Sequence, residues 1–471
     1  MKKTKIIATI GPSSQDIDII RQMILEGTDS LRVNMKHASH EFLKDIKDKL
    51  DKLNDELKTC VSLIMDTRGP DITVGKFVSG QAYLNKDDKI RIYMNPIMGD
   101  STKFSISYSN LINEVKCNSF IKLNDGLIEL QVLDKGDDYL VCKVLTGGYI
   151  QDNKGVNILN VSLDLPFLSE KDIDDIKYAS KIGVDYVALS RVSCSEDILD
   201  VNDLLIDCKN DDIGILAKIE TEKAVEDIDA ILNVCDGMIV ARGDLGVEVP
   251  MERIPGIQKS IISKCHTAGK ISIVATEMLS SMEQQARPTR AEVSDVANAV
   301  LDSCDAVMLS GETTIGKYPV ETVSMMSKIV ESSEYDVNYY ELTDKAMRTQ
   351  TQDTTGMLSY SVTECANRLK TVAIVAPTMS GHTAKKMSRF RPMCPIIAMS
   401  PNDNTAKNLS LYYAVCPVKV NAIKNFDQIM TKSKEVVSKL MDIEAGNKII
   451  ITGGYPFQEV KHTNFMKIEE L

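Results

Sequence analysis

Polar residues that could carry out chemistry follow short apolar runs at several points in this chain. "ILAKIE" places Lys218 and Glu220 two residues apart at the end of such a run, and "ARGDLG" places Asp244 near two glycines. Residues two apart on a strand point to the same face. Other polar residues in the same kind of position are Arg32, Asn34, Asp66, Thr67, Arg242, Thr276, Ser310 and Glu312. This recurrence indicates a site rather than surface solvation.

The carboxylates of Glu220 and Asp244 favour a Mg²⁺ ion. Mg²⁺ takes oxygen ligands from a few carboxylates, waters and substrate, and no His/Cys grouping here suits zinc. A buried Lys218–Glu220 pair that merely braces the fold is the alternative. Acidic residues after two successive runs, together with the lysine, favour a metal and a bound anion.

Phosphate-binding motifs are otherwise sparse. The chain has no GxxxxGK[ST] loop, so phosphoryl chemistry would depend on charged side chains and a metal rather than a P-loop. "TMSGHT", residues 378–383, opens a predicted helix with hydroxyl groups and a glycine. Such a helix start can bind a phosphate, although Ser and Thr are also ordinary helix caps.

The elements that must position these residues are strands and helices in alternation. Eight apolar runs predict strands at 5–10, 30–34, 61–66, 184–189, 213–219, 237–241, 271–276 and 306–310, with amphipathic helical patterns between them. Continuously apolar strands are typical of a parallel sheet covered on both faces. We expect a closed (β/α)₈ TIM barrel, whose function sits at the carboxyl ends of its strands. An open doubly wound sheet fits the strand count equally well.

The length of 471 residues suggests about three domains. From about 72 to 164, short alternating segments separated by Asp, Gly and Asn predict an inserted all-β cap. After about 350, helices and strands alternate again, with one helix expected over 404–414, and predict a doubly wound α/β domain. The predicted domains are residues 1–70 plus 165–345 for the barrel, 71–164 for the cap and 346–471 for the C-terminal domain.

Charge and cysteine content limit the classes of partner. A net charge of −12 argues against binding nucleic acid or an anionic membrane through the whole surface. The eleven cysteines include no CxxC pair, and no long apolar stretch occurs. These features predict reduced thiols, no membrane partner and a cytoplasmic protein.

A series of longer strings resembles the pyruvate kinase family. They are "TKIIATIGPSS", "RVNMKHASH", "MDTRGPDI", "NDGLIELQV", "DNKGVN", "LPFLSEKD", "AKIET", "MIVARGDLGVE", "ATEMLSSM", "RPTRAEVSDVANAVLD" and "MLSGETTIGKYPVE". The match runs in order from residue 4 to "HTN" at 462–464. The resemblance implies the three-domain architecture predicted above and, usually, a homotetramer.

The resemblance implies Mg²⁺-dependent transfer of a phosphoryl group from phosphoenolpyruvate to ADP, giving pyruvate and ATP in glycolysis, with Mn²⁺ as another usable ion. It implies Glu220 and Asp244 as the metal ligands and Lys218, Arg32 and Thr276 as catalytic residues. The implied substrate positions are Arg32, Lys218, Gly243, Asp244, Thr276, Ser310 and Glu312. The implied nucleotide positions are Asn34, His37, Thr73, Asp125, Lys154 and Lys171.

Lys36 departs from the family pattern. The family has serine or threonine there and binds an activating K⁺ with Asn34, Asp66 and the Thr67 carbonyl. We therefore hypothesise that the Lys36 ammonium takes the place of K⁺, paired with Asp66 or Asp71. Alternatively, Lys36 points into solvent and the K⁺ site is only weakened.

Two further departures affect the charge near the substrate. Thr73 stands where the family has an arginine, and Arg191 stands where an aromatic residue is common. Losing a guanidinium at a phosphoryl site would slow transfer. Lys36 or Arg191 could restore the charge.

Two other functions are compatible with parts of the sequence. "KIETEKAVEDIDAIL" followed by "ARGDL" also resembles Mg²⁺-dependent lyases and aldolases that handle a pyruvate enolate, and a weakened paralogue could sense phosphoenolpyruvate or sugar phosphates. In the last domain, an allosteric sugar phosphate is bound by many family members at positions matching Thr378, Ser380, Gly381, His382 and Thr383, together with "HTN". The identity of any effector stays open.

Overall fold

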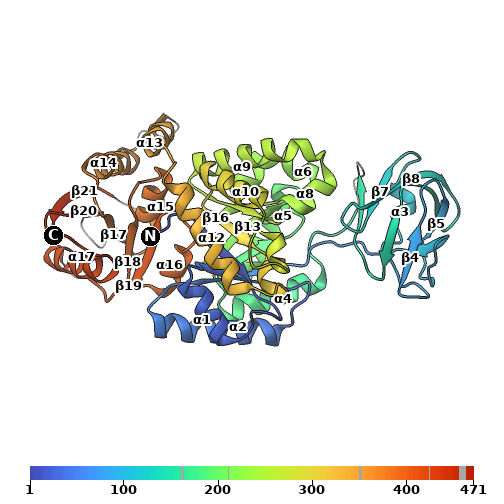
Figure 1. Ribbon diagram of the computed structural model, residues 1–471, viewed down its shortest axis with the longest axis horizontal. Coiled ribbons are helices and arrows are strands. Elements are labelled where there is room, and N and C mark those ends of the chain that lie inside the picture. Colours follow the sequence, from blue (N-terminus) through green and yellow to red (C-terminus); the bar gives the residue numbers. More distant parts are fainter. Residues whose placement is uncertain (160, 162–163, 211, 349–352, 424, 456–462) are drawn as a thin grey trace.

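Eight parallel strands form the centre of the molecule. The computed structural model describes residues 1–159, 161, 164–210, 212–348, 353–423, 425–455 and 463–471 (Figure 1). The strands are β1 (Lys5–Thr9), β2 (Ser30–Asn34), β3 (Ser62–Asp66), β12 (Tyr186–Leu189), β13 (Gly214–Ile219), β14 (Gly237–Ala241), β15 (Ile271–Ala275) and β16 (Ala306–Leu309). They pair in chain order, and β16 returns to β1. The closed barrel is confirmed, and the open sheet is excluded.

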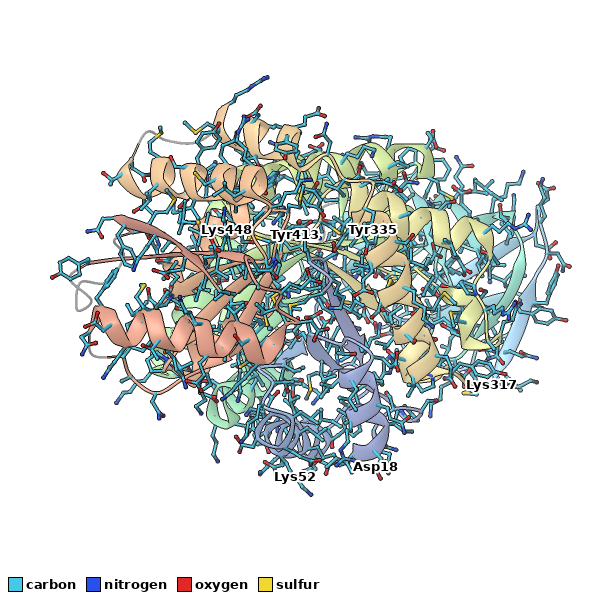
Figure 2. All side chains as sticks on the ribbon, turned by 60° about the vertical axis from the view of Figure 1, so that its left-hand side comes forward. Asp18, Lys52, Lys317, Tyr335, Tyr413 and Lys448 are labelled. Atoms are coloured by element: carbon cyan, nitrogen blue, oxygen red, sulfur yellow. The ribbon has the colours of Figure 1, made fainter. Side chains whose placement is uncertain are left out.

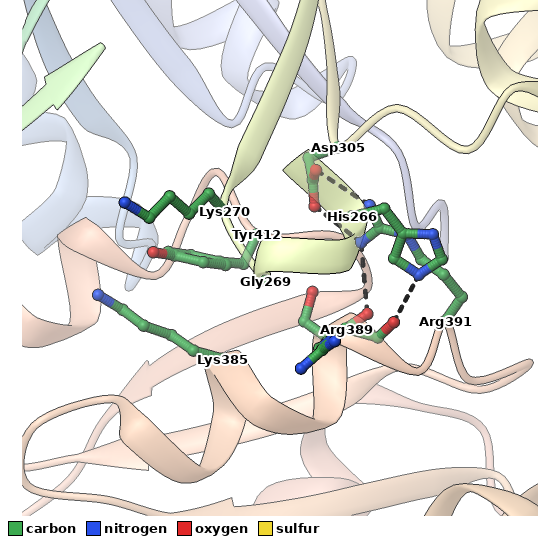
Figure 3. A pocket seen from close by; sticks show the side chains of 9 residues that line it. His266, Gly269, Lys270, Asp305, Lys385, Arg389, Arg391 and Tyr412 are labelled. Carbon is green, nitrogen blue, oxygen red and sulfur yellow. Dashed lines mark hydrogen bonds and ion pairs between the residues drawn. The ribbon is translucent and has the colours of Figure 1, made fainter. Parts of the chain in front are cut away.

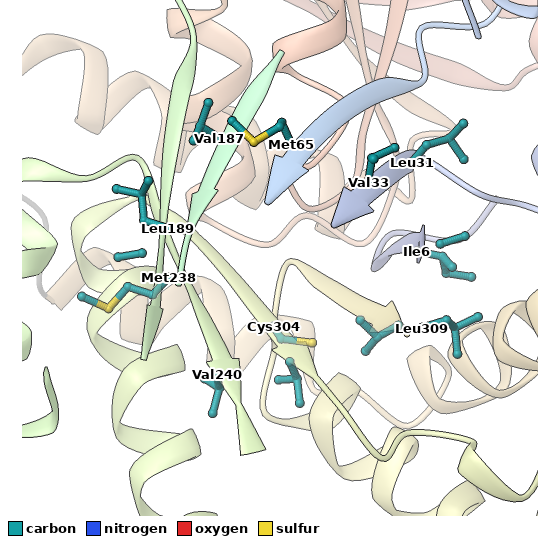
Figure 4. Packing of buried hydrophobic residues seen from close by; sticks show 14 of the residues in the cluster. Ile6, Leu31, Val33, Met65, Val187, Leu189, Met238, Val240, Cys304 and Leu309 are labelled. Atoms are coloured by element: carbon teal, nitrogen blue, oxygen red, sulfur yellow. The ribbon is translucent and has the colours of Figure 1, made fainter. Parts of the chain in front are cut away.

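Strand alternation divides the barrel core into two layers. Ile6 and Ala8 face outward and pack with the surrounding helices, whereas Ile7 between them packs in the other layer. Figure 4 shows part of the outer layer, including Leu31, Val33 and Leu309. The covering helices are α1 (Ile17–Leu25), α2 (His40–Leu57), α4 (Glu170–Ile182), α5 (Ser195–Asp207), α7 (Ile228–Val234), α9 (Ile254–Ala268), α10 (Arg290–Leu301) and α12 (Pro319–Glu334). Because both strand faces are covered, the strands read as continuous apolar runs.

Short helices connect the strands on the functional side. They are α6 (Glu222–Glu226), α8 (Arg242–Glu248) and α11 (Gly311–Thr314), with 3₁₀ turns at Met251–Arg253 and Ser280–Glu283. Ser169 is the N-cap residue of helix α4. Its hydroxyl accepts from the Asp172 N–H, and the Asp172 carboxylate accepts from the Ser169 N–H. This reciprocal cap explains why the helix starts there.

An all-β cap lies between β3 and β12. Its strands are β4 (Gln81–Leu84), β5 (Lys89–Tyr93), β6 (Lys103–Ser105), β7 (Phe120–Leu123), β8 (Ile128–Lys135), β9 (Tyr139–Thr146), β10 (Gly148–Gln151) and β11 (Val156–Leu159), with a short helix α3 (Leu111–Glu114). Six strands form one sheet in the order β11, β7, β8, β9, β5, β6, and β4 pairs with β10. In Figure 1 the cap projects from one end of the barrel. Its own buried core makes it a separate packing unit.

The C-terminal domain has a five-stranded sheet with helices on both faces. Its elements are α13 (Tyr339–Arg348), α14 (Thr354–Leu369), β17 (Ala373–Pro377), α15 (His382–Arg389), β18 (Ile396–Ser400), α16 (Asp403–Asn408), β19 (Val415–Lys419), α17 (Phe426–Leu440), β20 (Lys448–Gly453) and β21 (Phe465–Glu470). The order is β19, β18, β17, β20, β21, with β21 antiparallel at the edge. Helices α14 and α15 cover one face of the sheet, and their apolar residues belong to the same cluster as residues of the barrel interior. Helix α17 covers the other face, in a separate cluster. The predicted boundary at 345/346 falls inside α13.

The helix expected over 404–414 is too long. Helix α16 ends at Asn408, and the chain then turns so that Leu411 and Tyr413 become buried. The Tyr413 N–H donates to Asp305 at 3.2 Å, and the guanidinium of Arg391 lies over its ring. In Figure 2, Tyr413 is labelled between Lys448 of the C-terminal sheet and Tyr335, which follows α12 of the barrel, and its side chain is 2% exposed. Docking onto the barrel therefore overrides helix propensity here.

A buried ion pair joins the C-terminal domain to the barrel base (Figure 3). Both Arg391 and Asp305 are almost fully buried, with Nη1–Oδ1 and Nη2–Oδ2 distances of 2.8 and 3.0 Å. Beside them, Nε2 of His266 donates to the Arg389 carbonyl at 2.6 Å, and a cavity of about 10 Å³ remains. Since Asp305 immediately precedes β16, the domain docks at the amino ends of the barrel strands, opposite the rim that carries the polar residues.

All eleven cysteines lie in the described part of the chain and none forms a disulfide, in agreement with reduced thiols. Among the described helices, none has the length and apolar character needed to cross a membrane.

Candidate active site

Asp66, at the carboxyl rim of the barrel, contacts two cationic side chains. It ends β3 and is fully buried. Nε of Arg32 donates to Asp66 Oδ2 at 2.6 Å, and Nζ of Lys218 lies 3.5 Å from Oδ1. Burial acts to raise the pKa of Asp66, but the charges of Arg32 and Lys218 outweigh burial and hold that pKa below its ordinary value. Asp66 is therefore an ionised anchor for two cations.

Lys218 is held in place by three neighbours. Besides Asp66, its ammonium donates to the Ser190 hydroxyl at 2.8 Å and lies 2.8 Å from Oε1 of Glu220. Burial disfavours the ammonium, but Asp66 and Glu220 outweigh burial and raise the pKa of Lys218. The side chain is thus a fixed positive charge at the rim.

Ser190 is a site residue that the sequence reasoning missed. Its hydroxyl is within hydrogen-bond distance of Asp66 Oδ1 (3.1 Å) and of the Thr67 carbonyl (2.8 Å), and it accepts from Lys218. Its N–H donates to Oγ1 of Thr67 at 3.0 Å. Ser190 directly follows β12, so the rule that selected the other strand-end residues could have selected it. Thr9, the last residue of β1, accepts from Arg32 at 3.0 Å and was missed in the same way.

A glycine allows this packing around Ser190. Gly69 follows β3 with a φ of +73°, and a Cβ there would lie 2.9 Å from Ser190 Cβ and 3.0 Å from the Ser190 carbonyl oxygen. The backbone conformation and the close approach both favour glycine.

Glu220 and Asp244 are suited to hold a divalent metal. Glu220 is buried; its Oε2 accepts from the Arg191 N–H at 2.8 Å, and its Oε1 lies 2.8 Å from the Lys218 ammonium. Burial raises the pKa of Glu220, the Asp244 charge adds to this rise, and Lys218 opposes it. Asp244 is exposed in the first turn of α8. A buried carboxylate and an exposed carboxylate whose charge acts on it fit a Mg²⁺ ion whose remaining ligands are water and substrate.

The metal would depend on few protein ligands. Among the described residues, no group of three or more His, Cys, Asp or Glu side chains could hold a metal. A two-carboxylate site is typical of Mg²⁺, which keeps several waters and substrate oxygens, and it argues against a structural zinc site.

Thr276 lies in a strained turn after β15. Its φ is +68° and that of Glu277 is +53°. Its hydroxyl donates to the Ala275 carbonyl at 2.6 Å and accepts from the Gly243 N–H at 2.8 Å. Arg242 donates to the Thr276 carbonyl at 2.7 Å and pairs with Asp295. Arg242 therefore braces the turn, and the Gly243 N–H is engaged by Thr276.

Glu312 holds two backbone segments at the carboxyl rim of the barrel. This buried carboxylate accepts from the Ser310 N–H at 2.7 Å and from the Leu279 N–H at 3.1 Å. It thereby links the segments that follow β15 and β16. The Ser310 side chain stays at the rim, half-buried.

The segment after β2 places Lys36 beside Asp71. Oδ1 of Asn34 accepts from the Lys36 N–H at 3.0 Å, and the Lys36 ammonium pairs with the Asp71 carboxylate. Asp66 is occupied by Arg32 and Lys218 instead. Burial, followed by the charges of Lys36 and Arg68, lowers the pKa of His37. His40 begins α2 and bonds Asp175 at 2.7 Å.

The expected nucleotide positions fall on different elements. Asp125 is exposed in a turn next to α8: a Cβ on its neighbour Gly126 would lie 3.6 Å from Val247 Cγ1. Thr73 and Lys154 lie in the cap near its junction with the barrel: Thr73 donates from its N–H to Ser107 at 2.9 Å, and the Lys154 carbonyl accepts from Val74. Lys171, on α4, pairs with Asp175 at 3.3 Å. The described contacts do not join these four residues to one another.

The predicted effector segment connects β17 to α15. The Thr378 hydroxyl accepts from the Gly381 N–H at 2.9 Å, and Gly381 and His382 begin the helix. Ser380 lines a cavity of about 350 Å³. The buried Thr383 hydroxyl bonds Thr463 at 2.9 Å. His462 of "HTN" lies outside the described residues.

Comparisons with known proteins agree across the chain. The family model described as pyruvate kinase, barrel domain, matches residues 1–323, and the one described as pyruvate kinase, alpha/beta domain, matches residues 357–469. A Clostridium perfringens pyruvate kinase is 39% identical over 474 residues, covering 100% of both chains. Pyruvate kinases of Sporosarcina psychrophila and Staphylococcus aureus (strain USA300) are each 40% identical over 470 residues, covering 99% of this chain and 80% of theirs.

These matches do not support a lyase or a sensor paralogue. The two family models together account for the barrel and the last domain, and the similarity to the Clostridium protein extends over the full length. Together with the charged rim of the barrel, they show that the chain belongs to the pyruvate kinase family of phosphotransferases.

Proposed function

We propose that this protein transfers the phosphoryl group of phosphoenolpyruvate to ADP, yielding pyruvate and ATP in glycolysis. The observation that carries this proposal is the fixed, charged ammonium of Lys218 between Asp66, Ser190 and Glu220. A positive charge held in place before the reaction stabilises charge that develops on a transferring phosphoryl group and a departing enolate oxygen.

The local charge explains a need for Mg²⁺. Arg32 and Lys218 face three carboxylates, those of Asp66, Glu220 and Asp244, so the residues alone are net negative. A highly anionic substrate would be repelled from such a rim. We propose that Glu220 and Asp244 hold Mg²⁺, with Mn²⁺ as a substitute, and that the bound ion would neutralise substrate charge as a Lewis acid.

The other rim residues would bind and orient the substrate. Arg32 would hold the phosphoryl group, since Asp66 anchors its Nε and Nη2, while its Nη1 donates to the Thr9 hydroxyl. Thr276 and Asp244 would hold the carboxylate end, with the Thr276 hydroxyl positioned by the Gly243 N–H. The hydroxyls of Thr276 and Ser310, with Glu312 fixing the Ser310 backbone, would carry a proton through water to the enolate carbon.

The cap would contribute to the nucleotide site. We propose that Asn34, His37 and Lys171 on the barrel and Thr73, Asp125 and Lys154 on the cap surround ADP. The hydrogen bond from Lys122, three residues before Asp125, to the Val247 carbonyl of α8 supports this arrangement, because α8 also carries Asp244. Docking of the cap would exclude water from the rim.

We propose that Lys36 replaces the monovalent cation of the family. Its ammonium pairs with Asp71, and Asn34 Oδ1 accepts from the Lys36 backbone. Such a lysine would supply covalently the charge that K⁺ supplies at Asn34, Asp66 and the Thr67 carbonyl.

The resemblance supports three further proposals. A sugar-phosphate effector would bind at Thr378, Ser380, Gly381 and His382, with Thr383 bracing the helix start. The assembly would be a homotetramer, and the protein would act in the cytoplasm. Titration with sugar phosphates and light scattering on the purified chain test the first two.

A coupled assay tests the activity. Pyruvate formation from phosphoenolpyruvate should require both ADP and a divalent cation, and ATP should appear in equal amount. Absence of pyruvate with ADP and Mg²⁺ present would contradict the proposal. Pyruvate formed equally well without ADP would indicate hydrolysis and would contradict it too.

A further inference from the structure

Arg191 contacts three parts of the candidate site at once. It follows β12 with a φ of +57°, a conformation that a non-glycine residue keeps only where surrounding contacts impose it. Its N–H donates to Oε2 of Glu220 at 2.8 Å, while the other oxygen of Glu220, Oε1, lies 2.8 Å from the Lys218 ammonium. The backbone of Arg191 thereby orients one of the two proposed metal ligands.

The guanidinium of Arg191 points toward two carboxylates outside the substrate position. Nε lies 3.6 Å from Oδ1 of Asp71, and Nη1 lies 3.8 Å from Oε1 of Glu248. Asp71 is in the segment that leads from β3 into the cap, and Glu248 is the last residue of α8. All three side chains are at most 21% exposed, so these pairs are less screened than surface pairs.

Each carboxylate has a second partner that extends the connection. Glu248 Oε1 accepts from Asn157 of the cap strand β11 at 2.9 Å, and Asp71 pairs with Lys36. Next to Glu248, the Val247 carbonyl accepts from Lys122 of β7 at 2.7 Å. The end of α8 is therefore held by the cap, while its first turn carries Asp244.

We propose that Arg191 is a positioning residue that couples docking of the cap to the geometry of the metal ligands. Through its backbone it orients Glu220; through its guanidinium it ties α8, and hence Asp244, to the segment that leads into the cap. The proposal rests on the proposed function in that it takes Glu220 and Asp244 as metal ligands. Arg191 then acts on the metal and on the cap rather than directly on the phosphoryl group.

Metal binding to the full chain without substrate tests the proposal. The binding of Mn²⁺, followed by the electron paramagnetic resonance signal of the free ion, should be about 10-fold weaker in Arg191→Gln, since loss of a group that supports metal ligands typically costs 10- to 100-fold in affinity. Arg191→Lys should recover much of it, because pairs at 3.6 and 3.8 Å depend more on charge than on hydrogen-bond geometry. The matched control is Arg253→Gln, which removes an exposed pair with Glu222 at 3.2 Å.

Two further measurements distinguish loss of the coupling between cap docking and metal binding from a general loss of stability. Amide hydrogen exchange of residues 68–76 and 154–159 should accelerate in Arg191→Gln and not in the control. In steady-state kinetics, the Mg²⁺ activation constant should rise, while kcat at saturating Mg²⁺ should change little. Glu248→Gln should weaken Mn²⁺ binding in the same direction, and the double variant should be no weaker than Arg191→Gln alone, because both changes break the same connection.

Several outcomes would overturn the proposal. They are Mn²⁺ affinity and exchange rates in Arg191→Gln equal to those of the control, a loss confined to kcat, or equal defects in the Gln and Lys variants. If the unmodified chain makes pyruvate normally, such results reject only the coupling by Arg191. If the unmodified chain neither binds Mn²⁺ nor makes pyruvate, the proposed function fails and this inference fails with it.

Discussion

Replacement of Lys36 by serine should convert the enzyme from potassium-independent to potassium-dependent. Lys36→Ser removes the ammonium that pairs with Asp71 and restores the residue type usual in the family. The Asn34 and Thr67 oxygens would remain available to an added K⁺. Unmodified enzyme should show little difference between potassium and tetramethylammonium buffers.

The size of the effect follows from charge and exposure. Two unit charges about 4 Å apart interact by about 4 kcal/mol at an effective dielectric constant near 20. The Lys36 side chain is 44% exposed and Asp71 is 18% exposed, so solvent screens much of that interaction. A value of about 1–2 kcal/mol is therefore reasonable, which corresponds to about a 5- to 30-fold loss of rate without potassium.

Initial rates of pyruvate formation in the two buffers provide the measurement. Lys36→Ser should lose activity in tetramethylammonium and regain most of it as K⁺ is added. Lys44→Ser is the control, since it removes an exposed helix lysine that pairs with Asp48 at 2.6 Å. Strong potassium activation of the unmodified enzyme, or equal rates of Lys36→Ser in both buffers, would refute the reasoning.

Three further outcomes are expected. Gly69→Ala should lower kcat/KM and stability more than Gly80→Ala, because both have φ near +70° but only Gly69 faces Ser190, with open space at Gly80; equal effects in urea unfolding and steady-state assays would exclude the steric explanation. Lys218→Met should lower kcat by about 10³-fold or more, because it removes the fixed charge at the transferring phosphoryl group; circular dichroism confirms folding, and near-normal turnover would count against that role. Burial and the charge of Arg391 lower the pKa of His266 to about 3. Between pH 6.5 and 3, His266 is therefore protonated in the unfolded chain but neutral in the folded chain. The contribution of neutral His266 to the free energy of unfolding is complete above pH 6.5 and decreases as the pH falls toward 3, by about 2 kcal/mol at pH 5. The midpoint of urea unfolding should therefore depend less on pH in His266→Gln than in the unmodified protein, and an equal pH dependence would contradict the assignment.

The barrel was predictable because its strands are buried on both faces. A run such as "GMIVA" has no polar face, and eight such runs alternating with amphipathic helices leave few architectures. Strands β4 and β21 were not predicted, because β4 has one buried residue and β21 has none, so neither carries a strong apolar pattern. The early end of α16 was missed since burial of Tyr413 against the barrel depends on a contact more than a hundred residues away.

The sequence by itself determined the residue types at the strand ends, the segmentation into three units and the resemblance to one family. These are local properties, which depend on which residues follow each apolar run. Only the tertiary structure decided which charges meet: Asp66 takes Arg32 and Lys218, Lys36 pairs with Asp71, and Arg191 approaches Asp71 and Glu248. The physical reason is that closure of the barrel and placement of the cap bring together side chains distant in sequence, and burial then reduces the screening of their charges by solvent.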